Sequence, residues 1–308
     1  MKQQQASSTA KVVAAAMILL DSREETRHLI ARDAASWSEV FLSASRSGRF
    51  LAATVKCPIT RALWLALERG TLPGIIRHYA SRKRWIEAQC RASFADGYGQ
   101  LVVIGAGFDT LGLRMAQEFP QLNVIEIDHP ATQSEKRQGM AMRGKAWPEN
   151  MRFVAVDLEA ETIPASLLVD PHATVFVMEG LLMYLEEERV SALLENLRAM
   201  PVERSRVIVS YMCRRADGRA GFTLQSRLID LWLRLRHEPF RWSRTREQMT
   251  QWIENAGFSC SSHATGAEMA AGIPIGRALE GENYLLAERG IDQPGAFLEC
   301  GAIFSCDS

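Results

Sequence analysis

The sequence predicts an α/β fold in which a mostly parallel sheet is covered by helices on both faces. Between residues 100 and 212, short apolar runs rich in β-branched residues alternate with longer helix-like segments, which is typical of strand–helix–strand units. The runs are continuously apolar rather than alternating, as expected for strands that are buried on both faces. Residues 9–95 lack such runs, so we expect a helical region ahead of the sheet.

The N-terminal region predicts several helices, separated by breaks at residues 56–60 (KCPIT) and 69–74 (RGTLPG). Its first apolar stretch, residues 11–20, imitates the core of a signal peptide. The stretch is too short to span a bilayer, however, and no small-residue cleavage site follows it. We therefore expect an amphipathic or buried helix here and a cytoplasmic protein.

The predicted sheet begins near residue 101. Strands are expected at residues 101–105, 123–128, 152–157, 174–180 and 206–212, with a further candidate at residues 283–289. Helices are expected at residues 110–119, 186–200, 224–235 and 245–258. We expect a single domain over residues 1–308, made of a helical cap (1–95) and an α/β core (96–308) with lid helices around residues 215–245.

Composition argues against several classes of protein. Hydrophobic residues make up 47% of the chain and charged residues 23%, which suffices to bury a core. The 36 Lys and Arg residues balance 36 Asp and Glu residues, so the basic excess of a nucleic-acid-binding protein is missing. The six cysteines lack metal-ligand spacing, and we expect reduced thiols and no metal site. Cys300 and Cys306 could bridge, but cytosolic disulfides are rare.

Each of the first four predicted strands ends in a residue that could contact a cofactor. These residues are Gly105, Ala106 and Gly107 after the first strand, Glu126 and Asp128 in the second, Asp157 after the third and Glu179 after the fourth. Because ligands of parallel sheets bind beyond the carboxyl ends of the strands, we expect the four ends to form one site.

The glycine turn indicates which cofactor binds. The dinucleotide fingerprint G-x-G-x-x-G/A needs a small third residue, but Thr110 stands there, and Asp109 would repel a diphosphate. A carboxylate at this position suits S-adenosylmethionine, which carries a sulfonium and an ammonium group and no phosphate. Asp128 follows Gly107 by 21 residues, a spacing suited to a ribose contact in either cofactor.

Four segments together resemble the leucine carboxyl methyltransferase-like family of S-adenosylmethionine-dependent methyltransferases, and in particular its bacterial branch. They are LVVIGAGFDTLGLRM, VIEIDHPATQSEKR, VAVDLE and VMEGLLMYL, in this order. The resemblance covers most of the chain. It implies a class I, Rossmann-like methyltransferase fold with a mostly parallel seven-stranded sheet and a helical N-terminal cap.

The resemblance assigns the glycine turn to the methionine part of S-adenosylmethionine. Gly105, Ala106 and Gly107 would pass beneath it, and Asp109 and Thr110 complete the family's AGxDT pattern.

The remaining contacts follow from the same resemblance. Asp128 would bind the ribose, Asp157 and Leu158 the adenine, and Glu179 the amino group of the cofactor. Arg82 would pair with the cofactor carboxylate through a charge-assisted contact.

The N-terminal cap departs from the family pattern in two places. Met17 stands where the family often has a basic residue, and residues 32–35 read RDAA without the usual proline. Arg77 is the alternative to Arg82 if the alignment is shifted.

The resemblance implies methyl transfer to a carboxyl or hydroxyl group of a small molecule or peptide. We find no convincing general base and predict no catalytic residue, which favours a carboxylate because it is already ionised at neutral pH. Arg214 and Arg215 could steer an anionic substrate or belong to a solvated loop. An NAD-dependent oxidoreductase and a non-catalytic cofactor-binding protein are the alternatives. No nucleic-acid or membrane partner is expected, and the sequence leaves the oligomeric state open.

Overall fold

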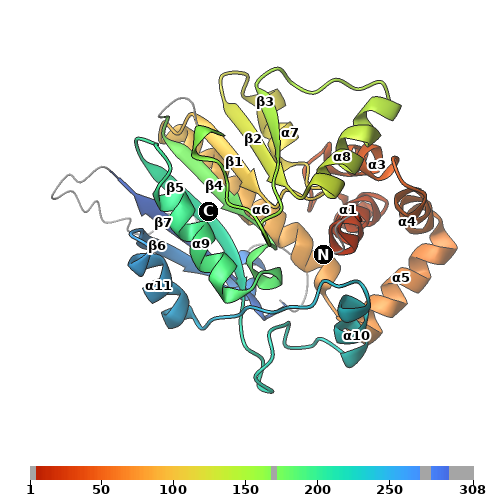
Figure 1. Ribbon diagram of the computed structural model, residues 1–308. Coiled ribbons are helices and arrows are strands. Elements are labelled where there is room, and N and C mark those ends of the chain that lie inside the picture. The colour runs from red at the N-terminus through yellow and green to blue at the C-terminus, as the bar shows by residue number, and fades with distance from the viewer. Residues whose placement is uncertain (1–4, 168–171, 271–278, 291–308) are drawn as a thin grey trace, which may run out of the picture.

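The computed structural model describes residues 5–167, 172–270 and 279–290. Within these ranges, seven strands form one sheet in the order β3-β2-β1-β4-β5-β7-β6 (Figure 1). The strands are β1 (Gln100–Ile104), β2 (Asn123–Asp128), β3 (Met151–Ala155), β4 (Thr174–Met178), β5 (Ser205–Met212), β6 (Ser259–Ala264) and β7 (Glu282–Arg289). The first five are parallel, and β7 runs antiparallel to β5 and β6. The predicted mostly parallel, seven-stranded sheet is therefore confirmed.

Helices precede the sheet and then alternate with its strands. Ahead of the sheet lie α1 (Ser8–Asp21), α2 (Glu24–Arg27), α3 (Ala34–Leu42), α4 (Arg46–Lys56), α5 (Pro58–Thr71) and α6 (Ile75–Ala95). The later helices are α7 (Leu111–Glu118), α8 (Pro130–Met142), α9 (Glu187–Arg198), α10 (Arg227–Leu235), α11 (Arg246–Asn255) and α12 (Gly266–Ala270). The short 3₁₀ helices η1 (Ala165–Leu167) and η2 (Leu182–Tyr184) follow β3 and β4. The helical region ahead of the sheet and both of its breaks agree with the sequence.

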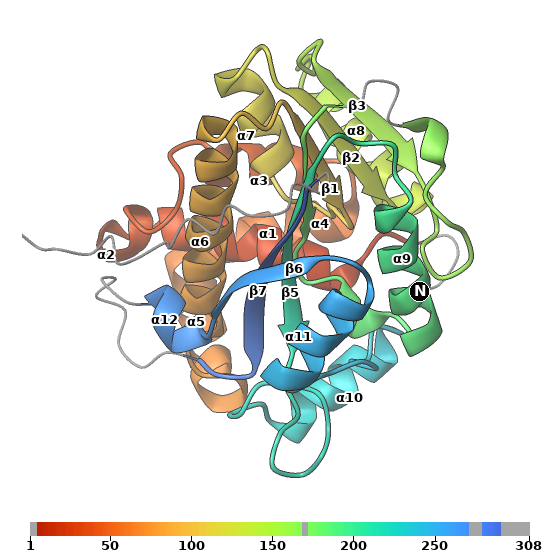
Figure 2. The ribbon, with the colours of Figure 1, turned by 90° about the vertical axis from the view of Figure 1, so that its left-hand side faces the viewer.

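Side chains of the central strands alternate between two buried layers. Leu101 and Val103 of β1 belong to a core shared with α1, α3, α6 and α7, whereas Val102 and Ile104 belong to a core shared with α9 and α11. Successive side chains of a strand point to opposite faces, so a strand covered on both faces must be apolar throughout. Figure 2 shows α6 and α9 on opposite sides of the sheet.

Helix α1 lies inside the molecule. Every residue from Ala14 to Leu20 is at most 6% exposed, and the helix packs against α3, α4 and α6. The stretch that imitates a signal-peptide core is therefore a buried helix, which decides between the amphipathic and the buried alternative. In the part of the chain that the structure describes, no single helix is long and apolar enough to cross a membrane, although α4 and α5 meet that test as a pair bent by 95°.

The sequence-based prediction missed several elements, of which α8 and β6 are the longest. The edge strand β6 was not predicted because its sequence, SCSSHA, is polar and largely exposed. Helix α8 was not predicted because its sequence, PATQSEKRQGMAM, has no clear apolar stripe. The third and fourth strands are also shorter than expected, so Asp157 and Glu179 lie in the loops that follow them.

Residues 215–245, which the sequence predicts to form a lid, contact the N-terminal helices at α5. Helix α10 lies beside α5, and the Ser226 amide donates a hydrogen bond of 2.9 Å to the Thr71 carbonyl. Beyond α10, His237 adopts a left-handed conformation with φ of 61°. This turn brings Glu238 to the start of α1, where it accepts hydrogen bonds from the Ser8 and Thr9 amides. Cys300 and Cys306 lie outside the described residues.

Candidate functional site

A cavity of about 330 Å³ lies at the carboxyl ends of the parallel strands, with walls from α1, α5, α6 and α10. Ten residues predicted from the sequence to bind a cofactor line it: Arg82, Gly105, Ala106, Gly107, Asp109, Thr110, Asp128, Asp157, Leu158 and Glu179. Parallel register explains this convergence, because the strand ends meet at one edge of the sheet. Arg77, Arg214 and Arg215 do not line the cavity. The contacts of the ten residues with a cofactor stay a prediction.

The glycine turn is held by β2. Gly105 and Gly107 have φ of 71° and 51°, a conformation that favours glycine. The carboxylate of Asp128 accepts hydrogen bonds from the Gly107 amide and, at 2.6 Å, from the His129 amide. A Cβ atom on Gly105 would lie 2.9 Å from a methyl group of Leu181. The turn is therefore fixed in place and leaves bare backbone along the cavity.

Asp109 covers the N-terminus of α7. Its Oδ1 atom accepts hydrogen bonds from the Thr110 amide at 2.6 Å and the Leu111 amide at 3.2 Å. In dinucleotide-binding folds these amides bind the pyrophosphate. Because Asp109 already occupies them with a negative charge, the site does not suit a diphosphate.

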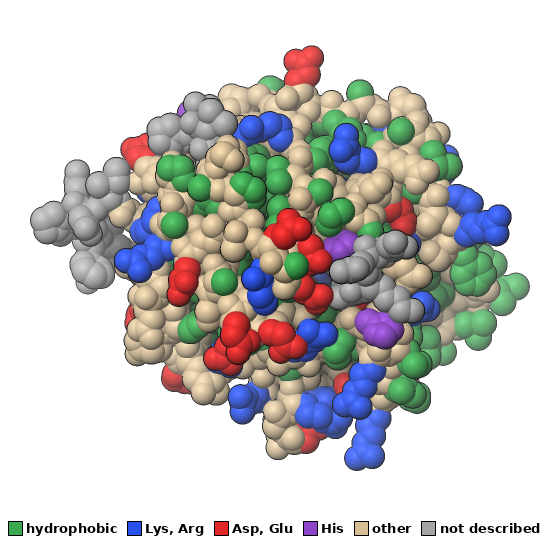
Figure 3. Space-filling model, viewed as in Figure 1, with side chains coloured by type: hydrophobic (Ala, Val, Ile, Leu, Met, Phe, Trp, Pro, Cys, Tyr) green, Lys and Arg blue, Asp and Glu red, His purple; other side chains and the backbone are tan. Residues whose placement is uncertain are grey.

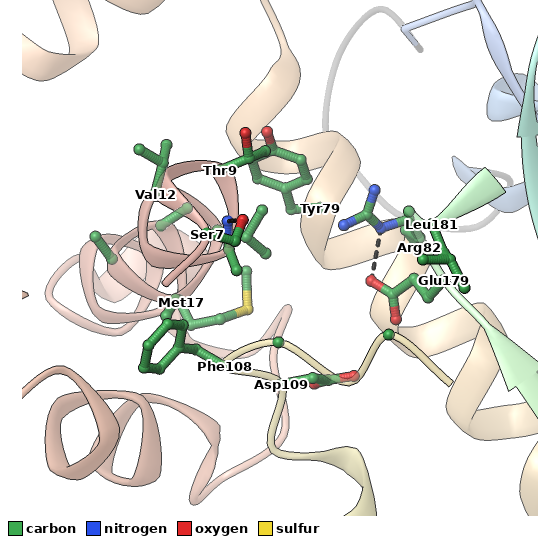
Figure 4. A pocket seen from close by; sticks show the side chains of 18 of the residues that line it. Ser7, Thr9, Val12, Met17, Tyr79, Arg82, Phe108, Asp109, Glu179 and Leu181 are labelled. Carbon is green, nitrogen blue, oxygen red and sulfur yellow. Dashed lines mark hydrogen bonds and ion pairs between the residues drawn. The ribbon is translucent and has the colours of Figure 1, made fainter. Parts of the chain in front are cut away.

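Two cations lie against the carboxylates of the cavity wall. Lys83 Nζ lies 2.9 Å from Asp109 and 2.8 Å from Glu179, and Arg82 Nε lies 2.7 Å from Glu179. Burial alone would raise the pKa of Asp109, but the nearby Lys83 lowers it to about 2. Figure 4 shows Arg82 and Glu179 on one side of the cavity and Met17 and Phe108 on the other.

Arg82 is also tied to the last strand. Its Nη1 atom lies 3.1 Å from Glu282 on β7, and His78 Nε2 lies 2.8 Å from the same carboxylate. Burial would raise the pKa of Glu282, but Arg82 and His78 hold it well below its usual range. Arg82 therefore links Glu179 on β4's loop to Glu282, and its position is fixed from two sides.

The second carboxylate oxygen of Glu179, Oε2, is buried and has no hydrogen-bond partner among the described residues. A buried carboxylate oxygen without a partner is costly. An ammonium group placed in the cavity would satisfy it. This orphaned acceptor fits the amino group of the cofactor that the sequence predicts.

The ribose and adenine end of the predicted site is more open. Asp157 has a side chain that is 25% exposed, and its Oδ2 atom lies 3.9 Å from His129 Nε2. Its Oδ1 atom accepts a hydrogen bond of 3.0 Å from the Glu159 amide. A carboxylate has about four acceptor positions, so Asp157 retains capacity for a ligand.

The sequence did not reveal Lys83, Glu282 and Glu238 as cavity residues. Lys83 lies between Arg82 and Arg84, and such a run of basic residues is also compatible with a plain exposed basic face. Glu282 contacts Arg82, and Glu238 contacts Thr9. Each pair is separated by more than 190 positions, so no local sequence pattern predicts these contacts. Their roles arise only from the tertiary fold.

The two departures from the family pattern have different consequences. Met17 is 4% exposed and lines the cavity, so the position of the expected basic residue is apolar. Lys83 supplies a second cation to the same cavity from α6. The RDAA segment still begins a helix, with Asp33 at the start of α3 and Ala34 on the cavity wall.

Comparison with known families gives a match over more than half of the chain. The sequence profile described as "Leucine carboxyl methyltransferase" matches residues 11–198. This confirms the family resemblance that was inferred from the four motifs.

Two relatives carry the description "Putative S-adenosyl-L-methionine-dependent methyltransferase". The one from Mycolicibacterium smegmatis is 34% identical over 138 residues, which are 43% of this chain and 45% of the relative. The one from Mycobacteroides abscessus is 28% identical over 196 residues, which are 61% of this chain and 63% of the relative. The chain spans about half the length of most of the curated relatives that it matches. The description agrees with the cofactor that the sequence predicts.

Solved structures share the fold at low sequence identity. A protein from Thermobifida fusca described as a "putative methyltransferase" has a TM-score of 0.54 and 16% identity, covering 82% of this chain and 94% of its own. A DUF574 family protein from Streptomyces avermitilis has a TM-score of 0.52 and 18% identity, covering 75% of this chain and 90% of its own. The predicted class I methyltransferase fold is confirmed.

Proposed function

The chain belongs to the leucine carboxyl methyltransferase family, and from this premise we propose that it is an S-adenosylmethionine-dependent methyltransferase. The observation that carries the proposal is Asp109 at the N-terminus of α7, with the orphaned Glu179 oxygen nearby in the same cavity. The first disfavours a dinucleotide, and the second favours a ligand with an ammonium group.

We assign the cofactor contacts to residues of the cavity wall. Glu179 Oε2 would accept a hydrogen bond from the ammonium group of the cofactor. Arg82 and Lys83 would pair with the cofactor carboxylate and would also keep their contacts with Glu179. The Asp128 carboxylate already accepts hydrogen bonds from two backbone amides, and its remaining lone pairs would accept hydrogen bonds from the ribose hydroxyls. Asp157 would accept a hydrogen bond from the adenine amino group, and Leu158 would contact the adenine ring.

Bound S-adenosylmethionine supplies an electrophilic methyl group on a sulfonium. The chain's part is to align the acceptor with that methyl group and to exclude water, which can contribute several kcal/mol. The methyl group passes from sulfur to an acceptor oxygen, and the sulfur keeps the electron pair of the broken bond. A carboxylate acceptor has no proton to lose in this step.

Three side chains of the cavity wall, Tyr79, Tyr184 and Glu238, are poorly suited to act as a general base, and this supports a carboxylate acceptor over a hydroxyl. Burial raises the pKa of Tyr79 to about 12 and raises the pKa of Tyr184 further, so neither phenol is a base at neutral pH. Glu238 accepts hydrogen bonds from the Ser8 amide, the Thr9 amide and the Thr9 hydroxyl. We therefore propose O-methylation of a carboxyl group on a small molecule or peptide, with a hydroxyl acceptor as the second candidate.

Calorimetry tests the cofactor assignment. We expect S-adenosylmethionine to bind the purified chain, and an Asp128→Ala variant to bind at least tenfold more weakly. A Glu149→Gln variant, changed at an exposed acid, serves as the matched control and should bind normally. The absence of binding, or equal binding by Asp128→Ala, would contradict the proposal. Binding of NADH in a fluorescence titration would favour the oxidoreductase.

Mass spectrometry of the purified protein tests the reaction class. We expect co-purified S-adenosylhomocysteine, and methyl esters rather than methyl ethers when carboxylate and hydroxyl acceptors are supplied with labelled cofactor. Cofactor binding without methylation of any acceptor would favour a non-catalytic cofactor-binding protein.

A further inference from the structure

Helices α5 and α10 expose apolar side chains that no described part of the chain covers. Six of the nine large hydrophobic residues that are strongly exposed lie on these two helices, with exposures from 54% to 77%. They are Ile59, Leu63 and Leu67 on α5 and Leu228, Leu231 and Leu235 on α10. We call these six residues the leucine face.

The spacing of the leucine face is helical on both elements. On α5 the side chains recur every four residues, and on α10 they recur after three and four residues, so each set forms one stripe. On α10 the opposite, buried side is also apolar, with Leu233 4% exposed. Helix α10 therefore has more apolar surface than the described part of the protein buries.

The two stripes belong to one surface. The Ser226 amide, just before α10, donates a hydrogen bond to the Thr71 carbonyl at the end of α5. Figure 3 shows hydrophobic side chains gathered over α5 and α10, at the lower right, beside Lys and Arg side chains. Leu67 belongs to the leucine face and also lines the cavity, so the apolar surface continues into the site.

The border of the leucine face is basic. Four exposed arginines lie on these helices or directly after them: Arg69, Arg227, Arg234 and Arg236. The acids of the two helices are engaged elsewhere. Glu68 accepts a hydrogen bond of 2.9 Å from the Gly74 amide, and Asp230 pairs with Arg215 at 3.2 Å.

This charge distribution selects the partner. A second copy of the chain would bring a like-charged arginine border against the first, which opposes association. An anionic lipid surface complements the arginines and accepts the leucines at the boundary between headgroups and acyl chains. We propose that the leucine face and its arginine border form a peripheral docking surface for anionic membranes.

The proposal departs from the sequence-based expectation of a protein without a membrane partner. Docking in this orientation brings Leu67, which is exposed and also lines the cavity, to the lipid surface. It involves no bilayer span, and it is independent of the proposed methyl transfer.

Vesicle cosedimentation of the full chain tests the proposal. Vesicles of phosphatidylglycerol and phosphatidylcholine in equal parts should bind the chain, vesicles of phosphatidylcholine alone should bind it much more weakly, and added salt should reduce binding. Equal binding to both kinds of vesicle, or binding to neither, would overturn the proposal.

Variants separate the apolar and the charged contributions. Leu231→Glu with Leu235→Glu should abolish binding, whereas Met142→Glu, at an exposed methionine of α8, should bind normally. Arg234→Gln should weaken binding about fivefold, as expected for one cation near an anionic surface, and Arg143→Gln should not. Circular dichroism and cofactor calorimetry on each variant establish that it folds.

Light scattering of the free chain identifies the competing occupant. A monomer that binds vesicles supports docking to lipid. A dimer that dissociates in the Leu231→Glu, Leu235→Glu variant would assign the leucine face to a second copy and overturn the proposal.

Discussion

The Nζ atom of Lys83 lies 2.8 Å from Oε1 of Glu179, and their side chains are only 15% and 6% exposed. The same ammonium group lies 2.9 Å from Asp109. One cation on α6 therefore joins the glycine turn after β1 to the loop after β4. These two loops form the wall where we place the methionine part of the cofactor, so Lys83 ties the two sides of that wall together.

Removing Lys83 should destabilise the fold. In a Lys83→Met variant, Asp109 loses its nearest counterion and Glu179 keeps only Arg82, so we expect a loss of about 3 kcal/mol in unfolding free energy. A Glu179→Gln, Lys83→Met double variant should cost at least about 1 kcal/mol less than the sum of the single variants. Urea denaturation measures all three, with Lys145→Met at an exposed lysine as control. Additive costs would show that the pair does not interact.

The pKa of Asp109 predicts a pH dependence of stability. Its folded pKa of about 2 lies below its ordinary value of 3.8, so the charged carboxylate stabilises the fold above about pH 4 and this contribution is lost as the pH falls towards about 2. The shift corresponds to about 2 kcal/mol.

An Asp109→Asn variant should therefore be less stable than the native chain at neutral pH, and the two should converge near pH 2. Chemical denaturation at several pH values measures this gap. Asp33→Asn, at an exposed acid that makes no capping hydrogen bond, should show no such convergence. A gap for Asp109→Asn that is independent of pH would mean that the carboxylate charge plays no part.

The sequence predicted those features of the fold that depend on local patterns. The continuous apolar runs located the five parallel strands, because strands covered on both faces leave no room for polar side chains. The polar strand β6 was not predicted, because it lies at the edge of the sheet and is identified as a strand only by its pairing with β7. The polar helix α8 was also not predicted, because it is buried by elements that are distant in sequence, such as α3.

The candidate site divides in the same way. The glycine turn, Asp128, Asp157 and Glu179 could be placed because each lies at or just after the end of a strand, and parallel strands bring their ends together. Pairs such as Arg82 with Glu282 join residues 200 positions apart. Such contacts depend on how α6 packs on the sheet, and no spacing in the sequence encodes them.

Gly105 and Gly144 provide a matched test of the glycine turn. Both have positive φ, 71° and 61°, so alanine should cost about 1 kcal/mol at either position. Only at Gly105 would the new methyl group meet a neighbour, Leu181, at 2.9 Å, whereas nothing lies within 4 Å at Gly144. We expect Gly105→Ala to weaken S-adenosylmethionine binding at least tenfold and Gly144→Ala to leave it unchanged. If calorimetry gives the two variants equal affinities for S-adenosylmethionine, the glycine turn does not contribute to the cofactor site.

The contact between Glu238 and Thr9 joins the segment after α10 to the start of α1, and both residues line the cavity. Glu238 is 6% exposed and accepts hydrogen bonds from the Ser8 amide at 2.8 Å, the Thr9 amide at 2.9 Å and the Thr9 hydroxyl. Its negative charge at a helix N-terminus is favourable, and replacement by a neutral amide should cost about 1–2 kcal/mol.

A Glu238→Gln variant should therefore open the start of α1. We expect faster amide hydrogen exchange at Ser8 and Thr9, faster dissociation of the cofactor, and little change in the strands of the sheet. Glu188→Gln, at an exposed acid in the first turn of α9, controls for the loss of a helix-terminal charge without a lid contact. If exchange at Ser8 and Thr9 is the same in both variants, Glu238 caps a helix without closing the site, and access to the cavity must be governed elsewhere.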